Sequence, residues 1–193
     1  MLLSLLAAGC GSSADRVAPV PVAAPVPVLL QSDLGTVCNA VRLNADTVAT
    51  AAHCLEEGAS FTLNESGFVL PVEASRLHPA YPLADLQNAA RFDLAKLSVA
   101  APLGRGGRVV ILPVEPGPVD IVAVTQAGAT RIVRCQYLGR SGTLVELACA
   151  VDLGWSGAPV VQNGALVGIL SARGRSDRTD IVQMTDATLL QSF

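Results

Sequence analysis

The segment DLGWSGAPVV, Asp152 to Val161, decides how the rest of the chain is interpreted. Ser156 stands between Trp155 and Gly157, with a proline three residues after it. Glycines at 154 and 157 permit a tight turn and can leave backbone N–H groups directed into a cleft, where they bind an oxyanion. Taken alone, glycines around a serine usually mark only a turn. Ser156 is therefore a candidate nucleophile that needs partners elsewhere in the chain.

The composition describes a globular chain with few charges. Of 193 residues, 51% are hydrophobic and 15% are charged, and the formal net charge is -3. These values suit one compact unit, or two small subdomains with a shared core, and argue against a disordered or coiled-coil protein. The chain has no Lys/Arg cluster of the kind that binds nucleic acid or an anionic membrane. We expect a monomer with no nucleic-acid partner.

The N-terminal segment MLLSLLAAGCGSS has the character of a processing signal. Its apolar run is shorter than the roughly 20 residues that cross a bilayer. It resembles the end of a bacterial lipoprotein signal, because small residues lead directly into Cys10. We expect a lipoprotein-type signal over residues 1–10 and lipidation of Cys10. The protein would then be exported to the periplasm or cell envelope and held there by the lipid anchor; without the anchor it would be secreted. The alternative is a truncated ordinary signal peptide.

Residues 11–32 are rich in Pro, Val and Ala and include the alternating stretch RVAPVPVAAPVPVLL. Such a composition favours extended polyproline II structure and cannot nucleate a helix. We expect a linker between an anchor and a folded domain that begins at residue 33. The alternative is an edge strand packed on that domain.

From Gly35 onward, short apolar runs alternate with turn residues. About a dozen runs of strand length predict an all-β barrel or sandwich. The residues Gln162-Asn163-Gly164 separate two apolar runs and predict a hairpin turn. Two stretches look helical, ADLQNAARF and the terminal TDATLLQSF, the second with Thr185 or Asp186 as its N-cap.

The cysteines indicate disulfides rather than a metal site. Apart from Cys10 there are four, at positions 38, 54, 135 and 149, and four cysteines allow three pairings. An even number in an exported chain is typical of disulfide bonding. The two histidines, His53 and His78, are too few for a convincing zinc site without carboxylates at ligand spacing. We therefore expect neither a metal nor a cofactor.

Two further residues are weak candidates until they are combined with Ser156. His53, in TAAHC, lies among small apolar residues, where a histidine is more often part of a core than a base. Asp93, in RFDLAKL, stands where a turn or capping aspartate is usual. The chain order His53, Asp93, Ser156 is nevertheless that of the chymotrypsin-like catalytic triad.

With these residues, the chain resembles the trypsin/chymotrypsin family from about 35 to 193. The stretch CNAVRLNADTVATAAHC is similar to the family pattern CGGSLI-x-x-x-x-VxTAAHC, RLHPAY to HPxY, and RFDLAKL to NDIALLKL. GWSGAPVV is similar to GDSGGPLV, and ALVGILSA to LVGIVSW. Five motifs in the family's order make the resemblance specific.

The resemblance implies two six-stranded antiparallel β-barrels and a short C-terminal helix, with an active site between the barrels. Barrel one would span about 33–104 and barrel two about 105–193. A serine endopeptidase acting on polypeptides is implied, with Ser156 as nucleophile, His53 as base and Asp93 orienting it. The N–H groups of Gly154 and Ser156 would form the oxyanion hole. The implied disulfides are Cys38–Cys54 and Cys135–Cys149. The alternative function is that of a catalytically silent binding protein of the cell envelope.

Trp155 departs from the family, which most often has an aspartate that pairs with a new N-terminal ammonium after zymogen cleavage. No IVGG start precedes Cys38 at the usual distance, so we expect an enzyme active without such cleavage. The resemblance places the substrate pocket at Ala150 and along Ser171, Ala172 and Arg173. Because Ala150 stands where trypsin has an acidic residue, we expect a small or medium apolar P1 residue.

Overall fold

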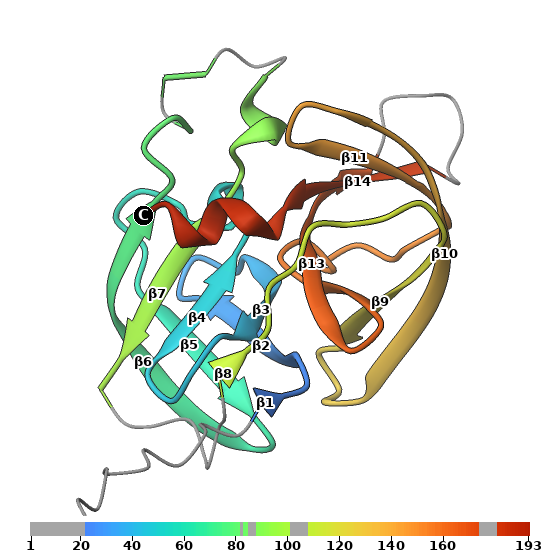
Figure 1. The fold of residues 1–193 in the computed structure, drawn as a ribbon. Helices are drawn as coiled ribbons and strands as arrows, with labels where there is room; N and C mark the ends of the chain where they lie inside the picture. The colour runs from blue at the N-terminus through green and yellow to red at the C-terminus, as the bar shows by residue number, and fades with distance from the viewer. Residues whose placement is uncertain (1–21, 82, 85–87, 101–107, 174–180) are drawn as a thin grey trace, which may run out of the picture.

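The computed structural model describes residues 22–81, 83–84, 88–100, 108–173 and 181–193. Two closed six-stranded barrels lie side by side (Figure 1), with strand orders β2-β3-β4-β7-β6-β5 and β10-β11-β14-β13-β12-β9. All pairings within the two barrels are antiparallel. The predicted fold class is therefore confirmed.

Barrel one consists of β2 (Val26–Ser32), β3 (Val37–Arg42), β4 (Thr47–Thr50), β5 (Phe61–Glu65), β6 (Phe68–Leu77) and β7 (Ala95–Val99). Barrel two consists of β9 (Pro118–Val124), β10 (Thr130–Ser141), β11 (Leu144–Ala148), β12 (Pro159–Gln162), β13 (Ala165–Arg173) and β14 (Ile181–Asp186). A parallel pair, β1 (Val22–Ala23) with β8 (Arg108–Val109), lies outside the barrels.

Each barrel closes around its own apolar core. In β9, buried Val119, Ile121 and Ala123 alternate with more exposed residues, as the two-residue period of a strand requires. One cluster of buried residues is centred on barrel one and also includes Leu166 and Ile169 of β13, and the second lies in barrel two; aliphatic side chains fill most of both. The single tryptophan, Trp155, belongs to the core of barrel two.

The linker predicted over 11–32 requires a correction, because its C-terminal part is folded. Strand β2 pairs with β3 over Val26–Gln31 and with β5 over Leu29–Ser32, so barrel one begins at residue 26 rather than 33. Pro27 lies in the part of β2 that pairs with β3 alone, where a missing N–H can face an unpaired edge. Residues 1–21, including Cys10, lie outside the described part of the structure.

The turn predicted at 162–164 joins β12 to β13. Gln162 pairs with Ala165, and Asn163 and Gly164 between them have φ of 52° and 81°. Positive φ at both central residues is the condition of the type I′ hairpin, which asparagine and glycine meet at low cost. The prediction is confirmed at this turn.

The helical segments are short 3₁₀ helices. η1 is Ala52–Cys54, η2 is Ala89–Arg91 and η3 is Ala187–Gln191. Asp186 caps η3 by accepting a hydrogen bond from Thr188 N at 2.8 Å, as expected for one of the two proposed caps. Of ADLQNAARF, only 89–91 is helical among the described residues. None of the described helices is long and apolar enough to cross a bilayer.

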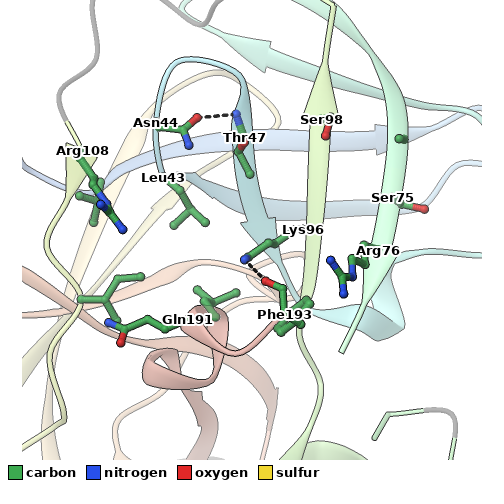
Figure 2. A pocket seen from close by; sticks show the side chains of 14 residues that line it. Leu43, Asn44, Thr47, Ser75, Arg76, Lys96, Ser98, Arg108, Gln191 and Phe193 are labelled. Carbon is green, nitrogen blue, oxygen red and sulfur yellow. Dashed lines mark hydrogen bonds between the residues drawn. The ribbon is translucent and has the colours of Figure 1, made fainter. Parts of the chain in front are cut away.

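The C-terminal segment returns from barrel two to barrel one. Ala187 and Leu190 of η3 are buried in the core of barrel one, and the segment crosses the molecule in Figure 1. It borders a cavity of about 660 Å³ that also exposes Arg76, Lys96 and Arg108 (Figure 2). The Lys96 ammonium donates a hydrogen bond to the Phe193 carbonyl, and its Nζ lies 4.9 Å from the centre of the Phe193 ring. None of the predicted site residues lines this cavity.

Candidate active site

A second cavity, of about 460 Å³, collects the three candidate residues from distant parts of the sequence. His53 belongs to η1 of barrel one, Asp93 precedes β7, and Ser156 precedes β12 of barrel two. The described lining residues are His53, Tyr81, Ala89, Ala90, Asp93, Val151, Asp152, Leu153, Gly154, Trp155, Ser156, Leu170 and Ser171. The wall is mainly apolar, and Asp93 is the lining residue bonded to the imidazole.

His53 is fixed to Asp93 through two hydrogen bonds. Its ring Nδ1 lies 2.6 Å from Asp93 Oδ2, and its backbone N–H donates to Asp93 Oδ1 at 2.8 Å. The hydroxyl of Ser171 donates to the same Oδ2 at 2.5 Å. The aspartate side chain is 4% exposed and that of His53 is 40% exposed. A buried carboxylate therefore orients an imidazole that is open to the cavity.

Burial lowers the pKa of His53, but the hydrogen bond and the negative charge of Asp93 raise it more, so that the net shift is upward. The charged imidazolium is thus stabilised by the group that also orients the ring. This is the electrostatic arrangement that a general base requires when it accepts a proton.

Residues 154–158 form a turn, called the Ser156 turn. Its first three carbonyls accept hydrogen bonds, whereas two of its N–H groups have no partner among the described residues. The carbonyls of Gly154, Trp155 and Ser156 all accept hydrogen bonds, at 2.7–3.0 Å. Within the described part of the chain, nothing accepts from the N–H of Gly154 or of Ser156. Both residues line the cavity, where two such donors can stabilise an oxyanion.

The Ser156 hydroxyl donates to the main-chain carbonyl of Ser171 at 3.5 Å, a long hydrogen bond. Within the described residues this hydroxyl bonds the Ser171 carbonyl and not the imidazole, although Ser156 and His53 line the same cavity. The catalytic hydrogen bond between a nucleophile and its base is often long or poorly aligned in unliganded enzymes and tightens when substrate binds.

Trp155 lines the cavity and is also part of an apolar core. Its side chain is 5% exposed and is buried in the core of barrel two, with Ala158 and Leu170 in the same cluster. An aspartate at this position would place a charge in apolar surroundings. The tryptophan instead anchors the Ser156 turn to barrel two by packing.

The Trypsin family model matches residues 17–188 of the chain. The chain belongs to the trypsin family. A search of curated proteins found no match. The two disulfides are the pairings implied by the family resemblance: Cys38 to Cys54 and Cys135 to Cys149, each with S–S of 2.05 Å.

Two solved structures also have this fold. Mouse neuropsin, a serine protease expressed in the limbic system of the brain, aligns with a TM-score of 0.68 at 17% identity over 86% of this chain and 92% of that one. An inactivated protease paralogue from the scabies mite aligns with a TM-score of 0.70 at 16% identity over 86% and 90%. At these identities, the similarity establishes the fold alone, and any argument for activity must come from the residues of the site.

Of the predicted substrate-binding residues, Ser171 lines the cavity and Ala150 does not. Ala150 is exposed and is absent from the described lining of this cavity, and its place in a P1 pocket stays a prediction. Val151, Asp152 and Leu153, which lie between the end of β11 at Ala148 and the Ser156 turn, line the cavity. The side chains of Ala172 and Arg173 are outside the described structure.

Sequence reasoning missed two residues of the site. Tyr81 lines the cavity, and its pKa is raised by burial and by the negative charge of Asp93. Its signal was the final position of the HPAY motif. Asn39 is buried behind the Ser156 turn, and its signal was an amide where the trypsin-family pattern CGGSLI has its first glycine.

One described group has the spacing of metal ligands, formed by Cys38, His53 and Cys54. Its two sulfur atoms are bonded to each other in a disulfide, so neither is available as the thiolate that binds a metal ion. The group is therefore explained by the disulfide beside His53.

Gly157 should tolerate no side chain. Its φ is +82°, and a Cβ there would overlap the carbonyl oxygen of Asn39 and the hydroxyl of Thr50. We expect Gly157→Ala to lower the free energy of unfolding by about 3 kcal/mol or more, measured by urea denaturation of the oxidised protein. The control Gly128→Ala has similar φ, +79°, and open space, and should cost only about 1–2 kcal/mol. Equal losses would contradict the proposed overlap.

Proposed function

We propose that the protein is a serine endopeptidase that acts through Ser156, His53 and Asp93. Ser156 Oγ attacks the scissile carbonyl while His53 Nε2 takes its proton, and the same imidazolium then protonates the leaving amine. Water hydrolyses the acyl-enzyme by the reverse transfers. Asp93 holds Nδ1 protonated and stabilises the imidazolium. The N–H groups of Gly154 and Ser156 bind the oxyanion.

The observation that carries the proposal is the arrangement around His53. The imidazole is oriented by a buried carboxylate at 2.6 Å and shares a cavity with Ser156. The turn of this serine has two N–H donors, of Gly154 and Ser156, that no group of the described residues accepts from. Membership of the trypsin family supports peptide bonds as the bonds cleaved. The mainly apolar lining supports an apolar P1 residue.

Activity should not need cleavage to a new N-terminus. The ion pair made after zymogen activation needs an aspartate where this chain has Trp155. Burial of Trp155 in barrel two and hydrogen bonds to all three carbonyls at 154–156 support a Ser156 turn that is already ordered.

The two disulfides support folding in an oxidising compartment, and hence an exported protein. We further propose that Cys10 carries a lipid anchor. Mass spectrometry of the N-terminus extracted from membranes tests this, and an unmodified Cys10 would return the segment to an ordinary signal.

Covalent labelling tests the proposed function. We expect a fluorophosphonate probe to label the oxidised full-length protein at Ser156, and to leave Ser156→Ala unlabelled. Absence of labelling in wild-type protein with both disulfides formed would contradict the enzyme and favour the silent binding protein.

The pH dependence of kcat/KM should follow from the raised pKa of His53. The base must be neutral, so activity is low while the imidazole is protonated and rises as pH passes its pKa. Because Asp93 raises that pKa, we expect the midpoint above the usual histidine value of about 6.5. A midpoint below that value would contradict the geometry of the pair.

A further inference from the structure

Asn39 is a fully buried polar side chain that lies between the two barrels, behind the Ser156 turn. It belongs to β3 of barrel one and has no exposed surface. Its side chain reaches Val124, the last residue of β9 in barrel two, and Gly154. One amide thus links three segments that are distant in the sequence.

Every hydrogen-bonding group of this side chain is used. Oδ1 accepts from Val124 N at 2.7 Å, and Nδ2 donates to Val124 O at 3.2 Å and to Gly154 O at 2.9 Å. The orientation of the amide is chemically determined, since an N–H must face Oδ1 and two carbonyls must face Nδ2. No other side chain of this size offers one acceptor and two donors in that arrangement.

The main chain of the same residue holds the other end of the turn. Asn39 N donates to Ser156 O at 2.7 Å, and Thr50 Oγ1 donates to Asn39 O at 2.6 Å. Asn39 therefore binds both Gly154 O and Ser156 O. The intervening Trp155 O accepts from Ala158 N at 3.0 Å.

The Gly154 carbonyl is the one that most needs an external partner. Gly154 has φ of +82°, and glycine moves between backbone regions at little cost, so a free peptide group after it could rotate. This peptide group carries the N–H of Trp155, and its rotation would change the backbone torsions of Gly154 and Trp155 and so displace the neighbouring N–H groups of Gly154 and Ser156. The hydrogen bond from Asn39 Nδ2 opposes this rotation.

We propose that Asn39 is a positioning residue that holds the Ser156 turn with the N–H groups of Gly154 and Ser156 free to bind an oxyanion. Barrel one supplies this amide, and barrel two supplies the buried Trp155 on the other side of the turn. The inference rests on the proposed protease function for its kinetic consequence. Its structural part, the ordering of the turn, is independent of activity.

The first test compares Asn39→Ala with wild-type full-length protein. We expect kcat per titrated active site to fall about 10²-fold, the typical effect of losing one oxyanion donor, with KM within a few-fold. The pH midpoint of kcat/KM should stay unchanged, because within the described residues the hydrogen bonds of the Asn39 side chain go to Val124 and Gly154 and not to His53 or Asp93. A lower Tm with unchanged kcat would show a merely structural residue and overturn the proposal.

Gln162→Ala is the matched control. Gln162 also binds main chain through its amide, accepting from Glu115 N and donating to Glu115 O, both at 3.0 Å, but it lies outside the cavity. We expect this variant to lose some stability and to keep wild-type kcat. Equal loss of kcat in both variants would overturn a specific role for Asn39.

A spectroscopic readout separates this proposal from the proposed function. In ¹⁵N spectra, Asn39→Asp, which keeps the size but replaces the donor, should shift and broaden the Gly154 and Ser156 amide signals. The wild-type Asn39 NH₂ protons should exchange slowly with solvent, a result that needs no variant to fold. Unperturbed signals or fast exchange overturn the proposal. A catalytically silent wild type with the expected spectra would refute the protease function alone.

Discussion

We expect Ser156→Ala and His53→Ala each to lower kcat about 10⁶-fold, and the double variant to lower it no further. The two residues act as one unit, because without the base the hydroxyl stays protonated and without the hydroxyl the base has no proton to take. The residual rate should come from the oxyanion donors of Gly154 and Ser156 and from substrate binding.

The measurement is a single-variant and double-variant comparison on one ester and one peptide substrate. An exposed serine on β7, changed as Ser98→Ala, provides the matched control and should leave kcat unchanged. If the fold-losses of kcat in the two single variants multiplied in the double variant, Ser156 and His53 would contribute independently, contrary to the mechanism.

Asp93→Asn should lower kcat/KM about 10⁴-fold while the fold is kept. The hydrogen bond from His53 N to Oδ1 requires an acceptor there, so the asparagine oxygen will take the Oδ1 position. Its NH₂ group then takes the position of Oδ2, which in the wild type bonds His53 Nδ1 and the Ser171 hydroxyl. Nδ1 must become the acceptor, the proton moves to Nε2, and the ring can no longer act as a base toward Ser156.

The lost charge gives this variant a second signature. Because the charge of Asp93 raises the pKa of His53, the pH midpoint of any residual activity should move downward. Asp120→Asn removes an exposed carboxylate that pairs with Arg134 at 2.9 Å, and should change kcat/KM little. A small effect of Asp93→Asn, near that of the control, would exclude the orienting role.

Local sequence patterns were enough for the elements whose physics is local. The alternation of β9, the Asn163-Gly164 turn and the Asp186 cap all follow from residues within a few positions of each other. The boundary at residue 26 was missed because Pro27 and its neighbours look like a linker until β3 and β5 provide partners. Ala150 was placed in the pocket by its position along the chain, which does not show which side chains face a cavity.

The sequence by itself determined the family, the two-barrel class and the identity of His53, Asp93 and Ser156 as candidates, because motif order and strand periodicity are properties of the linear chain. Only the tertiary structure decided how Trp155 is accommodated and that Asn39 binds Gly154, 115 residues away. Burial and long-range hydrogen bonds depend on which segments meet across two closed barrels. Local propensities do not specify which distant segments come into contact, and the conformation of the Ser156 turn depends on those contacts.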